Sequence, residues 1–299
     1  LIIVLVIYGF LTMKRSLDYR SEINIWEDTV KKSPYKSMAH NNLGTAYLSK
    51  KRLKEARQSF EVSSALSPSS ADPYINMGHI HARNEEWDKA KLKYDLALKL
   101  GANRSQVFFN SGLMRLKLNK PEEALPFLLE AIKIKNHRFL YHQELGNAFR
   151  MVKQYDLALK SYRKVLELEP NYVEAQNNLG LVFEYGKGVP QDYVETVKWY
   201  RLAAEQGYDI AQNNLGLMYA NGRGVKQDIA EAIKWYRLAA EQSYVEAQNN
   251  LGLVSEYGRG VPQDYEETVK WYRLAAEQGY DIAQNNLGLM YENGRGVKQ

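Results

Sequence analysis

The stretch AQNNLGLMY at residues 211–219 identifies the fold, because near copies of it recur along most of the 299-residue chain. The closest copies are AHNNLGTAY at 39–47, AQNNLGLVF at 175–183, AQNNLGLVS at 247–255 and AQNNLGLMY at 283–291. Each copy places a glycine between apolar residues in a stretch that is compatible with a helix. A glycine inside a helix costs roughly 1 kcal/mol relative to alanine. Its regular recurrence therefore indicates a packing role, most simply the close approach of a second helix.

Eight glycines, counting those in looser copies, set a fixed period along the chain. They are Gly44, Gly78, Gly112, Gly146, Gly180, Gly216, Gly252 and Gly288. Successive glycines are 34 residues apart up to Gly180 and 36 residues apart beyond it. A fixed period of about 20–50 residues is typical of solenoids built from stacked supersecondary units. The change from 34 to 36 residues indicates that two related repeat types are joined in one array.

Each repeat contains two stretches with apolar residues at i, i+3, i+4 and i+7, which predicts two amphipathic helices. The first, helix A, carries the glycine, and the second, helix B, carries a small residue and an aromatic one, such as Ala56 and Phe60. A small residue facing a large one lets antiparallel helices interlock. Because one helix pair cannot bury its apolar face alone, neighbouring pairs must stack. The sequence therefore predicts an all-α solenoid of helix-turn-helix repeats.

The 34-residue repeats resemble tetratricopeptide repeats (TPRs), and the resemblance implies a right-handed α-α solenoid. The first repeat carries the TPR signature residues at their usual spacing, namely Leu43, Gly44, Tyr47, Ala56, Phe60 and Pro68. The 36-residue repeats resemble Sel1-like repeats, which are marked by a glycine loop such as GKGVPQD at 186–192 and by a closing WYRLAAEQG at 199–207. In this loop we expect Gly186 to end helix A in a left-handed conformation and Asp192 to cap helix B.

The repeats and their flanks predict five parts in the chain. Residues 1–15 are expected to be the end of a truncated transmembrane helix, and residues 16–36 a capping helix. Four TPRs are expected at 37–172 and three Sel1-like repeats at 173–280. Residues 281–299 form a partial Sel1-like repeat that stops after helix A. We therefore expect the chain to be a fragment at both ends.

The transmembrane prediction rests on residues 1–13, LIIVLVIYGFLTM, which carry no charge and are followed at once by Lys14 and Arg15. Thirteen residues are too few to cross a bilayer, which needs about 20, so we interpret them as the tail of a membrane helix. A signal-peptide core and a buried capping helix are the alternatives. The repeat domain is accordingly predicted to be membrane-anchored, on either the periplasmic or extracytoplasmic side or the cytoplasmic side.

The junction at residues 15–44 resembles that of multi-pass membrane O-mannosyltransferases with C-terminal TPR arrays. It contains WEDTVKKSPYKSMAHNNLG, which leads from the apolar segment straight into the first repeat. The resemblance implies that a catalytic part would lie upstream and that the repeats lie on the non-cytoplasmic side. Basic residues beside the apolar segment, Lys14, Arg15 and Arg20, favour the cytoplasmic side instead.

Composition limits the possible functions. The chain contains no cysteine, which excludes a disulfide framework and thiolate chemistry. Residues 1–172 carry a net charge of +10, and residues 173–299 carry −5. Either the two repeat types have different solvated faces, or a basic half meets acidic partners or anionic lipid. The sequence has no dense Lys/Arg cluster interleaved with aromatic residues, so nucleic acid is not a predicted partner.

The sequence contains no catalytic motif of the HExxH, GxSxG or Cys–His type. Its only histidines are His40, His79, His81, His137 and His142. The pair at 79 and 81 does not share a helix face, and His40 and His142 occupy a packing position of helix A. The GxG loops follow helices rather than strands, which disfavours a phosphate loop. We predict no enzyme, cofactor, metal site or small-molecule substrate within these residues.

Asparagines stand two positions before seven of the eight glycines and form the candidate peptide-binding site. They are Asn42, Asn76, Asn110, Asn178, Asn214, Asn250 and Asn286. An asparagine amide both donates and accepts hydrogen bonds, so it can pair with a peptide bond. The array resembles the TPR superhelix of O-linked GlcNAc transferase, which implies an asparagine ladder that holds a peptide backbone on the concave side. Glu144 interrupts the series, and the alternative is that the amides tie neighbouring repeats together.

We therefore predict a non-catalytic scaffold, anchored in a membrane, that binds peptide or protein segments on the concave face of the solenoid. The alternative function is that of a C-terminal accessory domain of a multi-pass membrane glycosyltransferase of the O-mannosyltransferase kind. The sequence upstream of Leu1 distinguishes the two, because further membrane helices with an acidic catalytic pair would favour the enzyme.

Overall fold

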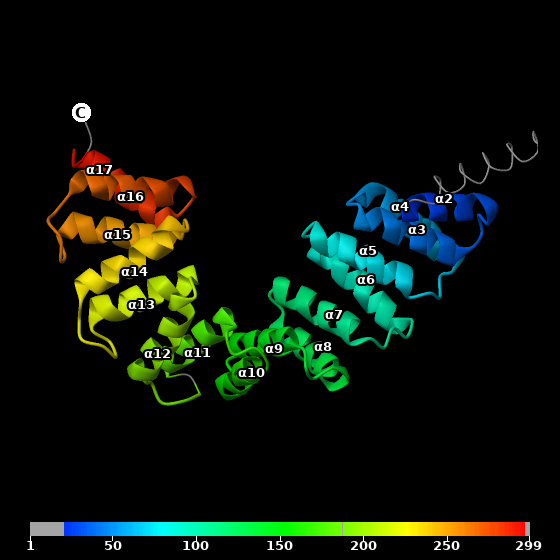
Figure 1. The fold of residues 1–299 in the computed structure, drawn as a ribbon, viewed down its shortest axis with the longest axis horizontal. Helices are drawn as coiled ribbons and strands as arrows, with labels where there is room; N and C mark the ends of the chain where they lie inside the picture. Colours follow the sequence, from blue (N-terminus) through cyan, green and yellow to red (C-terminus); the bar gives the residue numbers. More distant parts are fainter. Residues whose placement is uncertain (1–20, 187, 297–299) are drawn as a thin grey trace, which may run out of the picture. The chain divides into compact units, whose positions relative to one another are not determined.

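The computed structural model describes residues 21–186 and 188–296 (Figure 1). These residues form sixteen α-helices and no strand. The helices are α2 (Glu22–Lys32), α3 (Ser37–Ser49), α4 (Leu53–Leu66), α5 (Asp72–Arg83), α6 (Trp87–Lys99), α7 (Ser105–Lys117), α8 (Pro121–Ile134), α9 (Phe139–Met151), α10 (Tyr155–Leu168), α11 (Val173–Tyr185), α12 (Tyr193–Glu205), α13 (Asp209–Asn221), α14 (Ile229–Glu241), α15 (Val245–Tyr257), α16 (Tyr265–Glu277) and α17 (Asp281–Glu292). The predicted all-α repeat solenoid is confirmed.

The predicted end of a transmembrane helix lies outside the described residues. Among the residues that the structure describes, no helix is both long and apolar enough to cross a membrane. The first described helix, α2, packs against α3, as a helix that covers the first repeat would. Its Ile23, Trp26 and Val30 lie against the core of the first repeat.

The chain divides into two compact units, residues 1–137 and 138–299. Within each unit, every helix packs against the next one along the chain, so that helix pairs stack as layers (Figure 1). The first unit holds α2 to α8 and the second holds α9 to α17. Contacts between neighbours in the sequence dominate both units, which is the pattern of a repeat protein.

The repeated glycine of helix A is the point where helix B approaches, as the sequence predicts. A Cβ built on Gly44 would lie 2.5 Å from Cε1 of Phe60. A Cβ on Gly180 would lie 2.5 Å from Cδ1 and Cε1 of Tyr200. Atoms cannot approach so closely, so only glycine lets these aromatic rings lie flat against the helix backbone.

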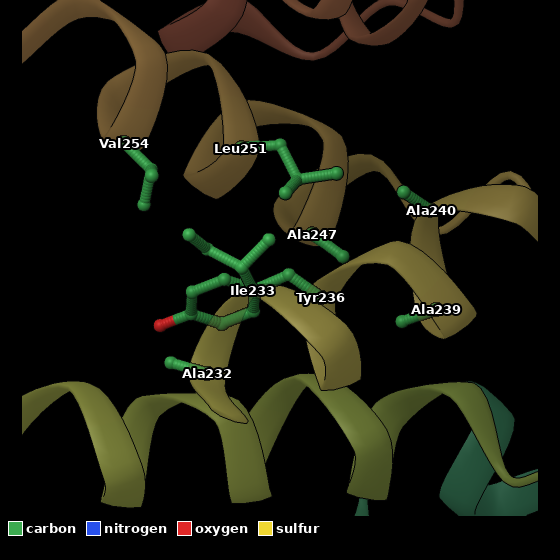
Figure 2. Close-up of a cluster of buried hydrophobic side chains, with 8 residues drawn as sticks. All are labelled: Ala232, Ile233, Tyr236, Ala239, Ala240, Ala247, Leu251 and Val254. Carbon is green, nitrogen blue, oxygen red and sulfur yellow. The ribbon is translucent and has the colours of Figure 1, made fainter. Parts of the chain in front are cut away.

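The buried core includes small clusters that each join helices of neighbouring repeats. The cluster in Figure 2 joins α14 to α15 through three large side chains, Tyr236, Ile233 and Leu251, with alanines between them. Ala232 and Ala239 of α14 and Ala247 of α15 are fully buried. Alanines at these positions let the two helices approach closely, while the larger side chains fill the space between them.

The longer loop of the Sel1-like repeats has the predicted caps. Gly186 ends α11 with φ of 60° and ψ of 34°, a left-handed conformation that glycine adopts without strain. The side chain of Asp192 accepts hydrogen bonds from the backbone N–H groups of Val194 and Glu195 at the start of α12. Asp228 and Asp264 cap α14 and α16 with one such bond each, from the backbone N–H groups of Glu231 and Glu267.

Replacing Ser255 by tyrosine is expected to raise the free energy of unfolding by about 1 kcal/mol. Ser255 is 4% exposed and stands where the preceding repeat has Tyr219. The hydroxyl of Tyr219 accepts a hydrogen bond from Nη2 of Arg201 at 2.7 Å. A tyrosine at 255 would fill the space left by serine, and its hydroxyl would meet Arg237, the counterpart of Arg201. Urea unfolding measures the change, with Ser255→Ala as the control; a lower midpoint for the tyrosine variant would contradict the prediction.

Candidate peptide-binding face

The predicted site asparagines all lie on A helices and are all half-buried. Their helices are α3, α5, α7, α11, α13, α15 and α17, for Asn42, Asn76, Asn110, Asn178, Asn214, Asn250 and Asn286 respectively. Every one of them comes two residues before the repeated glycine of its A helix, and in all of these repeats but the last that glycine lies against helix B. The helical period therefore turns these amides away from helix B and toward neighbouring A helices.

In the second unit, the asparagines form bonds between successive repeats. Nδ2 of Asn214 donates to Oδ1 of Asn177 at 3.1 Å. The next repeat has the same bond, from Asn250 to Asn213 at 2.9 Å. The last has it from Asn286 to Asn249 at 3.0 Å. In each NN pair, the second asparagine therefore donates to the first asparagine of the preceding repeat.

The first unit has this bond once. Nδ2 of Asn76 donates to Oδ1 of Asn41 at 3.1 Å. Nδ2 of Asn110 lies 3.2 Å from Nε2 of His79. Oδ1 of Asn110 accepts a hydrogen bond from Nε2 of Gln106 at 2.9 Å. The amide donors are thus used in the way that the alternative interpretation predicts, as ties between repeats.

The amide oxygens of the tying asparagines stay available. Within residues 21–186 and 188–296, Oδ1 of Asn76, Asn214, Asn250 and Asn286 accepts no side-chain or backbone hydrogen bond from the protein. The side chains of Asn42 and Asn178 make no hydrogen bond to another described residue. A half-buried carbonyl oxygen held in place by its own amide nitrogen is a preorganised acceptor. Such oxygens can take hydrogen bonds from the N–H groups of an extended peptide.

A second ladder, of glutamines, was not foreseen from the sequence. Gln206, Gln242 and Gln278 at the ends of B helices donate to Gln176, Gln212 and Gln248 of the A helices in the same repeats, at 2.8–2.9 Å. Nε2 of Gln212 donates in turn to the backbone oxygen of Ala204 in the preceding repeat. The sequence feature that could have indicated this ladder is the glutamine that recurs in every EQ and AQNN segment of the Sel1-like repeats. Because both amide groups are used inside the protein, this ladder is a structural device.

A pocket of about 520 Å³ opens beside the asparagine series in the second unit. It lies among α13, α14 and α15, and Asn250 forms part of its wall. Leu217 and Leu253 give it apolar walls, and Tyr236 and Arg259 supply polar groups. In this pocket the asparagine series borders a hollow that has hydrogen-bond donors in its wall.

The first unit has a larger and more basic hollow of about 910 Å³. Its lining includes Arg57, Lys89, Lys91, Lys93, Lys99 and Arg115. The guanidinium of Arg115 is held by both carboxylate oxygens of Asp95, at 2.9 and 2.8 Å, and by the Ser111 hydroxyl at 2.6 Å. It also lies 3.9 Å from the centre of the Phe127 ring. This buried ion pair fixes α7 to α6 and α8, so its first role is structural.

The structure gives contacts or burial for four of the five histidines. His40 Nε2 lies 2.8 Å from the backbone oxygen of Pro34, and His81 is paired with Glu86. His142 is 8% exposed, as a packing residue would be. Burial lowers the pKa of His79. In the described part of the chain, no three His, Cys, Asp or Glu residues come together as metal ligands would.

Comparison with protein families matches both predicted repeat types. The Sel1 repeat matches residues 173–208, 209–244, 245–280 and 281–299. Tetratricopeptide repeats match residues 18–71 and 105–138, and a further TPR repeat matches 146–184. The predicted combination of TPR and Sel1-like repeats is therefore confirmed.

Solved structures of repeat proteins share the fold. The c5321 protective antigen of uropathogenic Escherichia coli is 24% identical to this chain, with a TM-score of 0.63. The matched region covers 91% of this chain and 60% of the c5321 chain. A Sel1 repeat protein from Oxalobacter formigenes is 31% identical over 66% of this chain and 77% of its own, with a TM-score of 0.55. Among curated proteins, human protein O-mannosyl-transferase TMTC3 is 26% identical over 162 residues, which is 49% of this chain and only 18% of that protein.

Proposed function

We propose that this chain, which is a TPR and Sel1-like repeat protein, is a non-catalytic scaffold that binds extended protein segments along its A helices. The observation that carries the proposal is the set of amide oxygens left without a protein partner in the second unit. Asn214, Asn250 and Asn286 each present one such oxygen from an equivalent position. A peptide backbone offers N–H donors at regular intervals whatever its side chains are, so a series of equivalent acceptors favours an extended segment.

The bonds between repeats explain how the acceptors are held. Each amide is oriented because its nitrogen donates to the preceding repeat, so little conformational entropy is lost when its oxygen binds a ligand. Glu144 has no amide nitrogen to donate, and its carboxylate accepts from Nδ2 of Asn147 at 3.3 Å. We therefore place the main part of the proposed site in the Sel1-like repeats, where the asparagine bonds recur regularly.

Replacing Asn178, Asn214 and Asn250 together by alanine is expected to weaken peptide binding by roughly a hundredfold. Each lost hydrogen bond to the peptide costs about 1 kcal/mol, and about 1.4 kcal/mol corresponds to a factor of ten in affinity. The probe is a fluorescein-labelled, C-terminally amidated peptide of alternating serine and threonine, and binding is measured by fluorescence anisotropy. The triple variant also loses two ties between repeats, so its urea midpoint should fall as well.

Two single variants separate binding from stability. Asn178→Ala removes an amide that ties nothing, so affinity should fall about fivefold while unfolding is unchanged. Asn177→Ala removes the acceptor for Asn214, so it should lower the free energy of unfolding by about 1 kcal/mol. The hydrogen bond between Asn178 and the peptide should remain in this variant. Unchanged affinity in Asn178→Ala and in the triple variant would overturn the proposed function and leave the asparagines purely structural.

The second candidate is the accessory repeat domain of a membrane O-mannosyltransferase. The similarity to human TMTC3 over 162 residues supports it, together with the apolar residues 1–13 that lead into the repeats. We propose membrane attachment through that apolar segment for either candidate. Fractionation of the full-length protein and the sequence upstream of Leu1 test both points: several further membrane helices with a pair of acidic residues favour the enzyme domain, and a start shortly before Leu1 favours the anchored scaffold.

A further inference from the structure

In two of the Sel1-like repeats, a tyrosine of helix B donates to a half-buried glutamate of helix A, and in one of them an arginine of the following loop lies nearby. The hydroxyl of Tyr200 donates to Oε2 of Glu184 at 2.6 Å, and the hydroxyl of Tyr272 donates to Oε2 of Glu256 at 2.7 Å. Oε1 of Glu184 also lies 4.0 Å from Nη1 of Arg223 in the loop of the following repeat. A buried tyrosine hydroxyl usually has such a partner, because an unpaired one loses its bond to water.

The repeat between them lacks the carboxylate. The counterpart of Glu184 and Glu256 is Ala220, while the tyrosine and the arginine remain, as Tyr236 and Arg259. The partial fourth copy has glutamate again at this position. Alanine is therefore the exception among four nearly identical segments, and it removes only the acceptor of the group.

Within the described residues, the side chains of Tyr236 and Arg259 consequently have no hydrogen-bond or ion-pair partner, and the guanidinium of Arg259 lies only over the Tyr257 ring, 5.3 Å from its centre. Tyr236 is 3% exposed, and its hydroxyl makes no hydrogen bond to any residue that the structure describes. Its ring is packed against Ile233 and the neighbouring alanines, and the hydroxyl lies at the edge of the cluster, away from Ala239 (Figure 2). Burial raises the pKa of Tyr236, so the hydroxyl is a donor at neutral pH. Arg259 has no carboxylate within ion-pair distance in the described part of the chain.

The space that the missing side chain would fill is open. The 520 Å³ pocket is lined by Ala220, Tyr236 and Arg259, with Leu217 and Leu253 as apolar walls. This volume lies within the range of about 300–1,000 Å³ that is usual for ligand pockets. Two unpaired donors, one neutral and one cationic, therefore face a hollow in which the sister repeats hold a carboxylate.

We propose that this hollow, the Tyr236 pocket, binds a carboxylate of a bound peptide in the position that Glu184 and Glu256 occupy in the sister repeats. The carboxylate belongs to an acidic side chain or to a peptide C-terminus, since both present the same two oxygens. Hydrogen bonds and ion pairs to a carboxylate are stronger than those between neutral groups. The proposal rests on the proposed function and adds a selectivity to it, because Asn250, with its free amide oxygen, borders the same pocket.

The test uses three small probes that differ only in their carboxylate. N-acetylglutamate N-methylamide carries a side-chain carboxylate, N-acetylglutamine N-methylamide carries none, and N-acetylglutamine carries a terminal one. Each is titrated into the full chain to millimolar concentrations, and backbone amide resonances of α13, α14 and α15 are followed by NMR. Saturable shifts confined to these helices are expected with one or both carboxylate probes and not with the neutral one. Which of the two binds identifies the source of the carboxylate.

Variants with matched controls decide the assignment. Ala220→Glu restores the internal carboxylate and should abolish saturable binding while raising the urea midpoint. Tyr236→Phe should weaken binding by about tenfold or more, whereas Tyr272→Phe, which removes a hydroxyl that is already paired, should leave the probe affinity unchanged. Equal affinity for the neutral probe, no shifts with any probe, or unchanged binding in Ala220→Glu would each overturn the proposal. Binding of the neutral serine/threonine peptide is measured separately, so the scaffold function stands or falls independently.

Discussion

Replacing Asp95 by alanine is expected to destabilise the first unit by about 3–5 kcal/mol, the usual cost of leaving one partner of a buried ion pair unpaired. The side chain of Arg115 is 8% exposed and that of Asp95 is 23% exposed. Two parallel hydrogen bonds, of 2.9 and 2.8 Å, join them. Without Asp95, the guanidinium would keep its bonds to Ser111 and a longer contact, of 3.9 Å, to the exposed carboxylate of Glu123.

Urea unfolding followed by circular dichroism measures this loss, and hydrogen exchange in α6 and α7 assigns it to the first unit. Lys91→Ala is the matched control, because Lys91 also faces Asp95, at 3.7 Å, and is more exposed than Arg115. Its cost should be about 1 kcal/mol or less. The double variant Asp95→Ala, Arg115→Met should recover much of the loss, since it removes the unpaired charge. A loss below about 1 kcal/mol in Asp95→Ala would show that water reaches Arg115 freely.

The same pair makes stability depend on pH in a defined direction. Burial tends to raise the pKa of Asp95, but the hydrogen bonds from Arg115 and Ser111 outweigh it and hold the pKa below its ordinary value. An aspartate in an unfolded chain titrates near about 3.9. The stabilising contribution is therefore complete above that pH and is lost as the pH falls through the lower folded value. In Asp95→Ala, this part of the acid dependence should disappear.

Replacing Gly180 by alanine is expected to destabilise the second unit by about 1–3 kcal/mol, as overpacking of a filled core does. The added Cβ would lie 2.5 Å from Cδ1 and Cε1 of Tyr200. This ring is fully buried, and its hydroxyl is held by Glu184, so it has little freedom to move aside. The gain in helix propensity from glycine to alanine, about 1 kcal/mol, is too small to offset the clash.

Gly288→Ala is the matched control within the same chain. Gly288 occupies the equivalent position in α17, yet a Cβ there would meet no atom within 4 Å. Only the propensity gain remains, so this variant should be neutral or more stable by up to about 1 kcal/mol. Thermal unfolding of both variants gives the comparison. Effects of the same sign and size at the two glycines would contradict the role of close helix approach.

The sequence alone is sufficient to predict the fold, because the same pattern of packing residues recurs in every repeat. The 34- and 36-residue spacing of the glycines, with one large side chain of helix B for each of the first seven, allows only stacked helix pairs. The same periodicity places the seven candidate asparagines in equivalent positions, so their placement on the A helices could be predicted, whereas their half-buried state comes from the structure. Gly186 and Asp192 were predictable as caps because their chemistry is local.

Only the tertiary structure determines what these polar groups do. Whether Asn214 uses its nitrogen or its oxygen depends on the distance to Asn177, a residue of another repeat. The Tyr236 pocket depends on a residue that is absent: Ala220 is unremarkable in the sequence until Tyr200 and Tyr272 are seen to donate to glutamates at that position. Periodicity specifies which residues share a helix face, whereas hydrogen-bond partners and empty spaces follow from distances between helices, which no single repeat contains.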